Sequence, residues 1–371
     1  MKEEKKTYIT SFNCAKKFPF EDQDASSKIL ARLLPESSTH DVYALGFQEL
    51  VSTWEASFPT VVKPLVEHLS TLALNSINSR SRTRKYEVVA ATSTGAVALM
   101  VIADATFKVQ GVVSSNYKCG LFNSSLKGSA TVCCTLGKPQ QATSNETFTF
   151  ICSHLNANEG PENALLRVSN YREIMGSCAL DLRSTLFKAG HVFFLGDLNF
   201  RVNGWHDMET DYSDSTILAQ MLTNHEELNQ LRKDGKVFEG FTESPITFPP
   251  TYKYLTLKQS ALNHKRTPSW CDRVLYRKYQ PGTYSCTKYE SIDRFPELQF
   301  TDHQAVALDI NVPAIAFDEP LVIEATVISS NQKSVGNIAD LCIGYIGWFI
   351  YLRVYYGLLF GLALFILYKV F

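Results

Sequence analysis

Strand-like apolar runs recur along most of this 371-residue chain and constrain its fold more than any other feature. Each run is short and rich in β-branched or aromatic residues, and helical or polar stretches separate the runs. Many strands with interspersed helices indicate an α/β protein in which two sheets pack together. The expected strands are Val42–Phe47, Tyr86–Ala91, Val97–Ile102, Thr131–Leu136, Thr147–Ser153, His191–Leu195, Val274–Tyr276 and Ala305–Val312; the expected helices are Ser27–Leu34, Phe58–Ile77, Pro161–Leu186 and Thr216–Lys233.

Charge and cysteine content narrow the class of protein. The formal net charge is −1, whereas a nucleic-acid binder usually has a basic surplus, so no nucleic-acid partner is expected. Nine cysteines without a CxxC pair fit neither a disulfide framework nor a zinc ribbon. The charged start, Met1 to Lys6, precedes no apolar stretch, so no secretory signal is expected. These features predict a body that lies in the cytosol.

The last residues, 341–371, are almost wholly apolar, and Arg353 and Lys369 are their only charges. About 20 apolar residues span a bilayer as a helix. A buried Arg353 costs on the order of 3 kcal/mol unless it snorkels, so it either lies at an interface or divides the tail into two half-spans. The alternative is a buried helix of the soluble fold. We expect a C-terminal transmembrane helix, tail-anchored in the endoplasmic reticulum membrane, because a short span suits a thin bilayer.

The strand pattern fades after Val312, and a polar stretch with several serines precedes the tail. We therefore expect three segments: a catalytic domain over 1–312, a flexible linker over 313–340 and a membrane anchor over 341–371. Some 25 flexible residues have a root-mean-square reach of roughly 25–30 Å. Such a linker would keep the domain near a lipid surface without fixing its orientation.

Polar residues follow several of the apolar runs, at positions where a side chain can project into a cleft. Asp197 and Asn199 come after Gly196 and share a face if the chain stays extended, and His154 and Asn156 repeat that spacing. A carboxylate beside an amide can hold and polarise a water molecule. A lone polar residue at a strand end is usually a surface residue, but five such sites in one chain indicate chemistry. The other three sites are Asn13, Glu49 and the pair Asp302-His303.

Two further features concern what such a site binds. Glu49 is a hard ligand with amide oxygens around it and no Cys/His cluster, which favours Mg²⁺ over Zn²⁺. The runs FPPTYKY at 248–254 and RTPSWCDRV at 266–274 alternate aromatic residues with cations. That composition is expected of a pocket for a phosphorylated ring. Trp270 and Cys271 are interpreted as packing residues.

At these residues the sequence resembles the inositol-polyphosphate 5-phosphatase family. The family's signatures, approximately WxGDxNxR and RxPxWCDR, stand here as FLGDLNFR at 194–201 and RTPSWCDR at 266–273, with FPPTYKY between them. The resemblance covers about Tyr8 to Val312, and the apolar tail is similar to that of membrane-anchored fungal members. It implies the fold of DNase I and the apurinic endonucleases, a four-layer α-β-β-α sandwich of two mostly antiparallel sheets.

The resemblance implies Mg²⁺-dependent hydrolysis of the 5-phosphate of phosphatidylinositol 4,5-bisphosphate. Asn13 and Glu49 would hold the metal ion, with Glu49 as the direct ligand. Asp197 would orient and deprotonate the attacking water, and Asn199 would help to position it. A water molecule that attacks directly makes a Cys or Ser nucleophile unnecessary.

The same resemblance assigns the residues around the phosphoryl group. His303 would contact that group, kept protonated and aimed by Asp272. His154 and Asn156 would complete the phosphate-binding floor, and Asp302 would support the water or metal network. Arg201 and Arg273 would brace the site through its carboxylates. The substrate-binding residues implied by the family are Tyr252, Lys253, His264, Lys265, Arg266 and Arg273.

Some positions depart from the family pattern. Leu195 replaces the usual Trp before Gly196, and Thr301 replaces Ser before Asp302. The family's Asn-Lys-Gly motif survives as Leu126-Lys127-Gly128. Where relatives often place a lysine for the 4-phosphate, this chain has His264 with Lys265 beside it, so the headgroup preference stays open.

Four other functions remain possible on such a fold. They are hydrolysis of soluble inositol polyphosphates, a nuclease or other phosphodiesterase, a sphingomyelinase-like lipase, and an inactive module that only captures phosphoinositides. The anchor favours a lipid headgroup as substrate. The near-neutral charge and the TYKY and WCDR runs argue against a nuclease.

Overall fold

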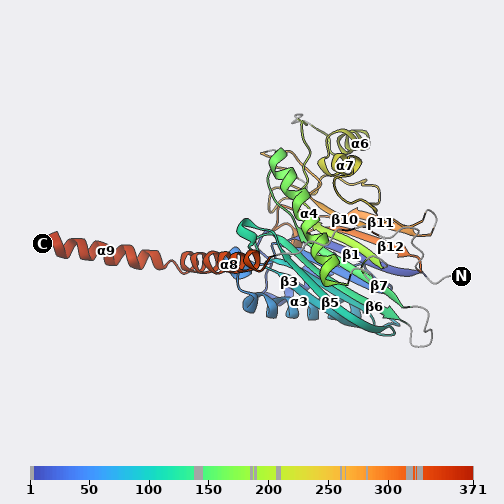
Figure 1. Ribbon diagram of the computed structural model, residues 1–371, viewed down its shortest axis with the longest axis horizontal. Coiled ribbons are helices and arrows are strands. Elements are labelled where there is room, and N and C mark those ends of the chain that lie inside the picture. Colours follow the sequence, from blue (N-terminus) through green and yellow to red (C-terminus); the bar gives the residue numbers. More distant parts are fainter. Residues whose placement is uncertain are drawn as a thin grey trace.

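Two six-stranded sheets lie face to face in the computed structural model, with helices on their outer sides (Figure 1). The structure describes residues 4–137, 145–183, 187, 190–205, 210–259, 261–263, 265–280, 283–314, 321, 323 and 329–370. The first sheet consists, in spatial order, of β11 (Ser285–Ser291), β12 (Val306–Val312), β1 (Lys5–Asn13), β2 (Val42–Gln48), β4 (Val97–Asp104) and β3 (Tyr86–Thr94). The second consists of β5 (Lys108–Lys118), β6 (Gly128–Gly137), β7 (Glu146–His154), β8 (His191–Asp197), β10 (Asp272–Arg277) and β9 (Phe241–Thr242).

The strands within each sheet are mostly antiparallel, as the resemblance implied. One pair in each sheet is parallel, β1 with β2 and β7 with β8. In those pairs Asn13 lies beside Gln48, and His154 lies beside Asp197. Because parallel strands end at the same edge of a sheet, their polar end residues meet there.

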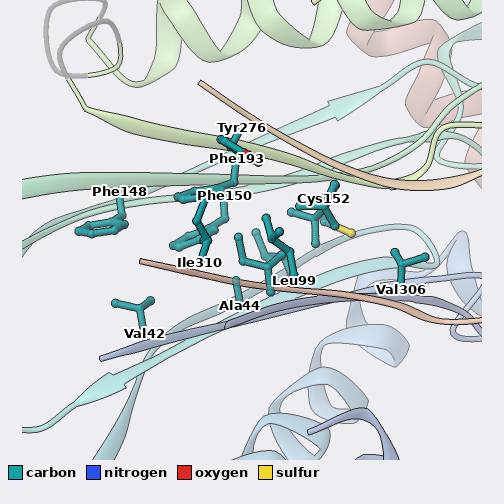
Figure 2. Packing of buried hydrophobic residues seen from close by; sticks show 14 of the residues in the cluster. Val42, Ala44, Leu99, Phe148, Phe150, Cys152, Phe193, Tyr276, Val306 and Ile310 are labelled. Atoms are coloured by element: carbon teal, nitrogen blue, oxygen red, sulfur yellow. The ribbon is translucent and has the colours of Figure 1, made fainter. Parts of the chain in front are cut away.

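Apolar side chains from both sheets fill the space between them (Figure 2). Val42 and Ala44 of β2 face this inner core, together with Phe148 and Phe150 of β7. The alternate residues of β2 pack on its other face, in the cluster that includes residues of α1 and α3. A strand buried on both faces is apolar throughout, which explains the continuous run in the sequence.

Helices cover the outer face of each sheet, so the expected four-layer α-β-β-α order is confirmed. The first sheet is covered by α1 (Gln23–Leu33) and α3 (Pro59–Ser79), and the second by α4 (Pro161–Asp181). The remaining elements are α2 (Thr53–Ala56), η1 (Leu121–Asn123), α6 (Ser215–Asn224), α7 (Glu227–Lys233), η2 (Pro296–Leu298), α8 (Ser330–Tyr351) and α9 (Val354–Val370).

One expected helix differs from the structure, and one strand was not expected. The helix expected over Thr216–Lys233 is two helices, α6 and α7, and the carboxylate of Glu226 caps α7 by accepting from the Asn229 amide at 2.7 Å. The strand β5 was not expected from the sequence. It lies at the edge of its sheet with most of its side chains exposed, so it lacks the apolar run of a core strand.

The C-terminal part also differs from the expectation. The linker expected over 313–340 is helical from Ser330 onward, where α8 begins. Among the helices that the structure describes, none by itself has the length and apolarity to cross a bilayer; α8 and the following helix meet the test only together, and they bend by 64° at their break. Arg353 lies at that break with φ +55°, so it divides the tail.

Candidate active site

Polar residues from five strand ends meet at one end of the sandwich. Asn13 ends β1, His154 ends β7 and Asp197 ends β8, while Asp272 begins β10 and pairs with Asp197 across the sheet. His303 precedes β12 and joins the same group. The glycine before Asp197 is required here: with φ +140°, a Cβ on Gly196 would lie 1.9 Å from a carbonyl oxygen of β7.

Asp197 is the centre of this group and is almost fully buried. Its Oδ2 atom accepts a hydrogen bond from Asn13 Nδ2 at 2.8 Å and lies 3.2 Å from His154 Nε2 and 3.8 Å from His303 Nε2. Burial by itself raises the pKa of Asp197, but the imidazoles of His154 and His303, together with Lys127, lower it well below its usual range. Asp197 is therefore a carboxylate at any working pH.

His303 forms a buried pair with Asp272. Its Nδ1 atom lies 2.9 Å from Asp272 Oδ2, and the same oxygen accepts from Thr251 Oγ1 at 2.8 Å. Burial lowers the pKa of His303, but Asp272 and then Asp197 outweigh burial and raise it to about 9. The imidazole therefore carries a proton at neutral pH. Tyr252 lies against it with ring centroids 4.7 Å apart.

Lys127 belongs to the site, although the sequence analysis noted it only as the remnant of a motif. Its ammonium lies against Nε2 of His154, directly before β6 begins. Burial and this neighbouring charge lower the pKa of His154. Gly128 begins β6 and lets that strand pair closely with β5, because its φ is +158° and a Cβ would lie 2.1 Å from the Tyr117 carbonyl oxygen. The motif remnant was the one signal that could have identified Lys127.

The expected metal ligands follow β1 and β2. Glu49 is half-buried with φ +46°, a strained conformation for a non-glycine residue, and its Oε2 atom lies 3.9 Å from Lys16 Nζ. Asn13 uses its Oδ1 atom to accept from the Ala15 amide at 2.9 Å. Burial raises the pKa of the adjacent Cys14 thiol well above its usual value.

A second group of possible ligands lies beside these residues. Asp197, Asp272 and His303 each offer one ligand atom, and these three atoms lie within 4.8 Å of one another. The buried Oδ1 atom of Asp272 has no hydrogen-bond partner among the described residues. Carboxylate and amide oxygens without a thiolate are the donors that Mg²⁺ prefers, so the residues present fit such a hard cation.

The polar residues that follow the strands take different positions. Asn199 has φ +58°; its amide nitrogen donates to Asp197 Oδ1 at 3.1 Å, and its side chain donates to the Leu155 carbonyl at 3.1 Å. These bonds fix the turn after β8. Asn156 instead donates to Asn163 Oδ1 at 2.8 Å, a bond that holds it within its own loop.

The expected substrate-binding residues Tyr252 and Lys253 lie beside the group. Lys253 Nζ lies 3.0 Å from Asp302 Oδ2. Burial raises the pKa of Asp302, but His303 and Lys253 outweigh burial and lower it. Arg201 places its guanidinium 4.8 Å from the Tyr252 ring centroid, which braces that ring. Of the other four expected residues, Lys265 is exposed and Arg266 half-exposed, so both are accessible to a ligand, and His264 lies outside the described residues; the fourth is Arg273.

Arg273 does not face the substrate side, and its expected substrate-binding role is wrong. The guanidinium is fully buried and bonds to Glu226 at 3.0 Å and to Glu243 at 2.7 Å. These carboxylates come from the N-cap of α7 and from the residue after β9. Arg273 therefore stabilises the packing behind the site. The carboxylates that it braces are Glu226 and Glu243, and not the carboxylates of the site itself.

The arrangement combines one permanent carboxylate, one protonated imidazole and one lysine around a common space. A carboxylate can orient a water molecule and accept its proton. Cationic donors placed beside it offset negative charge on a phosphoryl group. This site can therefore activate water against a phosphate ester without a covalent intermediate.

Comparison with known proteins agrees with this chemistry. The model of "Endonuclease/Exonuclease/phosphatase family 2" matches residues 10–309. A phosphatidylinositol 3,4,5-trisphosphate 5-phosphatase 1 of Mus musculus is 31% identical over 293 residues, 72% of this chain and 22% of that protein. Synaptojanin-1 of Rattus norvegicus is 27% identical over 248 residues, 65% of this chain and 15% of that protein. The chain thus spans less than a quarter of the length of these curated relatives.

Solved structures show the same fold. The inositol polyphosphate 5-phosphatase domain of a synaptojanin, solved with inositol (1,4)-bisphosphate and a calcium ion, has a TM-score of 0.66 at 23% identity, covering 92% of this chain and 90% of that one. A Cimex nitrophorin, solved as a ferrous NO complex, has a TM-score of 0.55 at 20% identity, covering 84% and 99%. The fold thus occurs with different ligands, and function rests on the side chains at its end.

Proposed function

The chain belongs to the endonuclease/exonuclease/phosphatase family, among its inositol polyphosphate 5-phosphatases, and from this premise we propose that it hydrolyses the 5-phosphate of phosphatidylinositol 4,5-bisphosphate. The observation that carries the proposal is the ionised Asp197, enclosed by Asn13, His154 and His303 and approached by Lys127. A phosphomonoester resists attack because its own negative charge repels a nucleophile. The site supplies positive charge on one side and a water-binding carboxylate on the other.

Asp197 would hold the attacking water through one carboxylate oxygen while Asn13 keeps the other in place. Its cationic surroundings make it a weak base by itself. A phosphate dianion bound against His303 and Lys127 would offset part of their positive charge. The pKa of Asp197 would then rise, so that this carboxylate could accept a proton from the attacking water. His303, protonated through its pairing with Asp272, would donate a hydrogen bond to a phosphoryl oxygen.

The proposed metal ion is Mg²⁺, held by Glu49 with Asn13 alongside. When bound, such a cation offsets phosphoryl charge and orients the phosphate. Glu49 is suited to this role because its carboxylate is half-buried and only Lys16, at 3.9 Å, forms an ion pair with it among the described residues. Tyr252, Lys253, Lys265 and Arg266 would recognise the rest of the headgroup, since they line the approach with an aromatic ring and cations.

The proposed location is the cytosolic face of the endoplasmic reticulum membrane, with the C-terminal helices as the anchor. In support, α9 is apolar on all sides, its described side chains are exposed, and it extends away from the body (Figure 1). A helix that is apolar all round is suited to lipid. The helices leave the sandwich at the end opposite the N-terminus, the end toward which β1 runs to Asn13 (Figure 1). The anchor would therefore direct the site end toward lipid.

Membrane attachment is checked by alkaline extraction of membranes from cells that produce the full chain or a chain ending at Leu352. We expect the full chain to stay in the membrane pellet and the shortened chain to be released. Release of both would remove the anchor from the proposal without affecting the proposed reaction.

The reaction is tested with vesicles that contain phosphatidylinositol 4,5-bisphosphate, with and without Mg²⁺, and with chromatography of the lipid products. We expect phosphatidylinositol 4-phosphate only with the metal, and no product from an Asp197→Asn variant. Asp24→Asn, which changes an exposed carboxylate on α1, serves as the matched control and should remain active. Hydrolysis of soluble inositol phosphates alone, or of a nucleic-acid diester, would contradict the proposed substrate.

A further inference from the structure

The helix α8 contains a buried acidic residue, Asp340, which a simple connection between the domain and an anchor would not require. Asp340 lies at the middle of α8 and is only 5% exposed. Its Oδ1 atom accepts hydrogen bonds from the amide nitrogen of Ser125 at 2.7 Å and from Ser125 Oγ at 2.9 Å. Its Oδ2 atom lies 2.8 Å from Lys118 Nζ. One carboxylate oxygen is thus bonded to the segment that joins β5 to β6, and the other to the last residue of β5.

The backbone of α8 also approaches this segment closely. A Cβ on Gly336 would lie 2.2 Å from the carbonyl oxygen of Asn123, so any larger residue would push the helix away. Asn337 adds a hydrogen bond from Lys118 Nζ at 2.8 Å. Further along, Tyr345 packs edge-on against Phe58 with ring centroids 5.3 Å apart. The helix is therefore docked by polar and apolar contacts together.

The segment that α8 contacts is the 119–127 loop, which places Lys127 in the active site. Ser125, which Asp340 holds, lies two residues before Lys127, and Lys127 contacts His154. The loop is closed at its base, where the Cys119 amide donates to the Lys127 carbonyl at 3.0 Å. Because the loop is anchored at this base and held by α8 on its other side, the position of the Lys127 ammonium depends on both attachments.

We propose that α8 is an intramolecular brace: through Asp340 it holds the 119–127 loop so that Lys127 stays in place against the phosphate. Asp340 is in this view a positioning residue that acts through Lys127. The expected effect on catalysis rests on the proposed function, whereas the bracing of the loop is inferred from the contacts alone. It also replaces the expected flexible linker with a structural part of the enzyme.

The test uses the full chain in detergent micelles with a water-soluble inositol trisphosphate, so that membrane binding plays no part. We expect Asp340→Ala to lower kcat on the order of tenfold, because a small displacement of a charged group near the reacting phosphate is costly. Asp340→Asn keeps an acceptor for Ser125 and should retain most of the activity. Ile338→Ala, at an exposed position of the same helix, is the matched control and should behave like wild type.

A double-mutant cycle separates positioning from general destabilisation. If Asp340 acts through Lys127, Asp340→Ala should have no further effect on kcat in a Lys127→Met background. Rates are measured well below the melting temperature of every variant. A full additional loss in that background, or an unchanged kcat for Asp340→Ala beside an active wild type, would overturn the brace.

Amide hydrogen exchange, read by mass spectrometry, tests the brace independently of turnover. Residues 119–127 should exchange faster in Asp340→Ala than in wild type, with exchange in β7 and β8 unchanged. Unaltered exchange in the loop would refute the brace even if the enzyme is active. A wild type that hydrolyses neither the soluble trisphosphate nor phosphatidylinositol 4,5-bisphosphate in vesicles, but shows the expected exchange, would refute the proposed function and leave the brace standing.

Discussion

Replacing Asp272 with asparagine should shift the pH range in which the enzyme works. The carboxylate is buried beside His303, 2.9 Å from Nδ1, and it is the first of the groups that raise the imidazole pKa to about 9. The side-chain amide of the Asp272→Asn variant would be neutral, so burial would then lower the pKa of His303 toward or below the ordinary value of 6.5. The difference corresponds to about 3 kcal/mol in favour of the imidazolium.

The direction of the shift in the pH profile depends on which protonation state of His303 is active. If protonated His303 is required, activity is present below its pKa and is lost as pH rises through it. Wild type should lose activity only near pH 9, and Asp272→Asn already above about pH 6.5. At pH 8 the protonated fraction would fall about thirtyfold, whereas at about pH 6 most of the imidazole would be protonated in both.

The assay is the pH profile of kcat/KM with a water-soluble inositol phosphate at saturating Mg²⁺. The matched control is Thr251→Val, which removes a hydroxyl donor from the same carboxylate at 2.8 Å but leaves its charge. This variant should keep the alkaline limit of wild type. If Asp272→Asn and wild type lose activity over the same pH range, the assignment of a protonated His303 is refuted.

Four further substitutions address the rest of the site and its support. Lys127→Met should lower kcat/KM by roughly 10²–10³-fold in initial-rate measurements, as loss of one positioned donor does; a rate near wild type would remove this lysine from the site. Arg273→Met removes the arginine that pairs with the buried Glu226 and leaves Glu243 with Arg232 at 3.8 Å, so it should lower the free energy of unfolding in urea by about 3–5 kcal/mol. Arg266→Ala should instead raise KM and change stability by less than about 1 kcal/mol; the opposite pattern for the two arginines would contradict their assignments. Glu49→Gln should raise the Mg²⁺ concentration for half-maximal activity at least about tenfold, and an unchanged metal dependence would exclude it as a ligand.

The position of the site could be predicted from the sequence because each of its main residues adjoins an apolar strand. Asp197 and His154 end two strands that pair in parallel, so a local pattern was sufficient to bring them together. Asp272 and His303 adjoin the starts of strands in opposite sheets, so their pairing depends on how the two sheets pack face to face. Distances within one sheet follow from strand register, which hydrophobic alternation determines, whereas the contact of Asn13 with Asp197 also requires that packing.

Other features depend on contacts between distant parts of the chain and left no local signal. The partners of Arg273 come from separate elements, so the WCDR run alone did not show that this arginine is buried. Lys127 lies in a loop whose motif is degenerate, and its place in the site follows from the turn before β6. Asp340 reaches Ser125 across more than half the chain, which no periodicity of α8 could reveal.

The most direct measurement of the central claim is hydrolysis of phosphatidylinositol 4,5-bisphosphate vesicles by the full chain in water labelled with heavy oxygen, with Mg²⁺. Mass spectrometry would identify both products. We expect phosphatidylinositol 4-phosphate without label, and inorganic phosphate carrying one labelled oxygen from the attacking water. Loss of the 4-phosphate instead, label in the inositol ring, or no release of phosphate at all would contradict attack by water at the 5-phosphate.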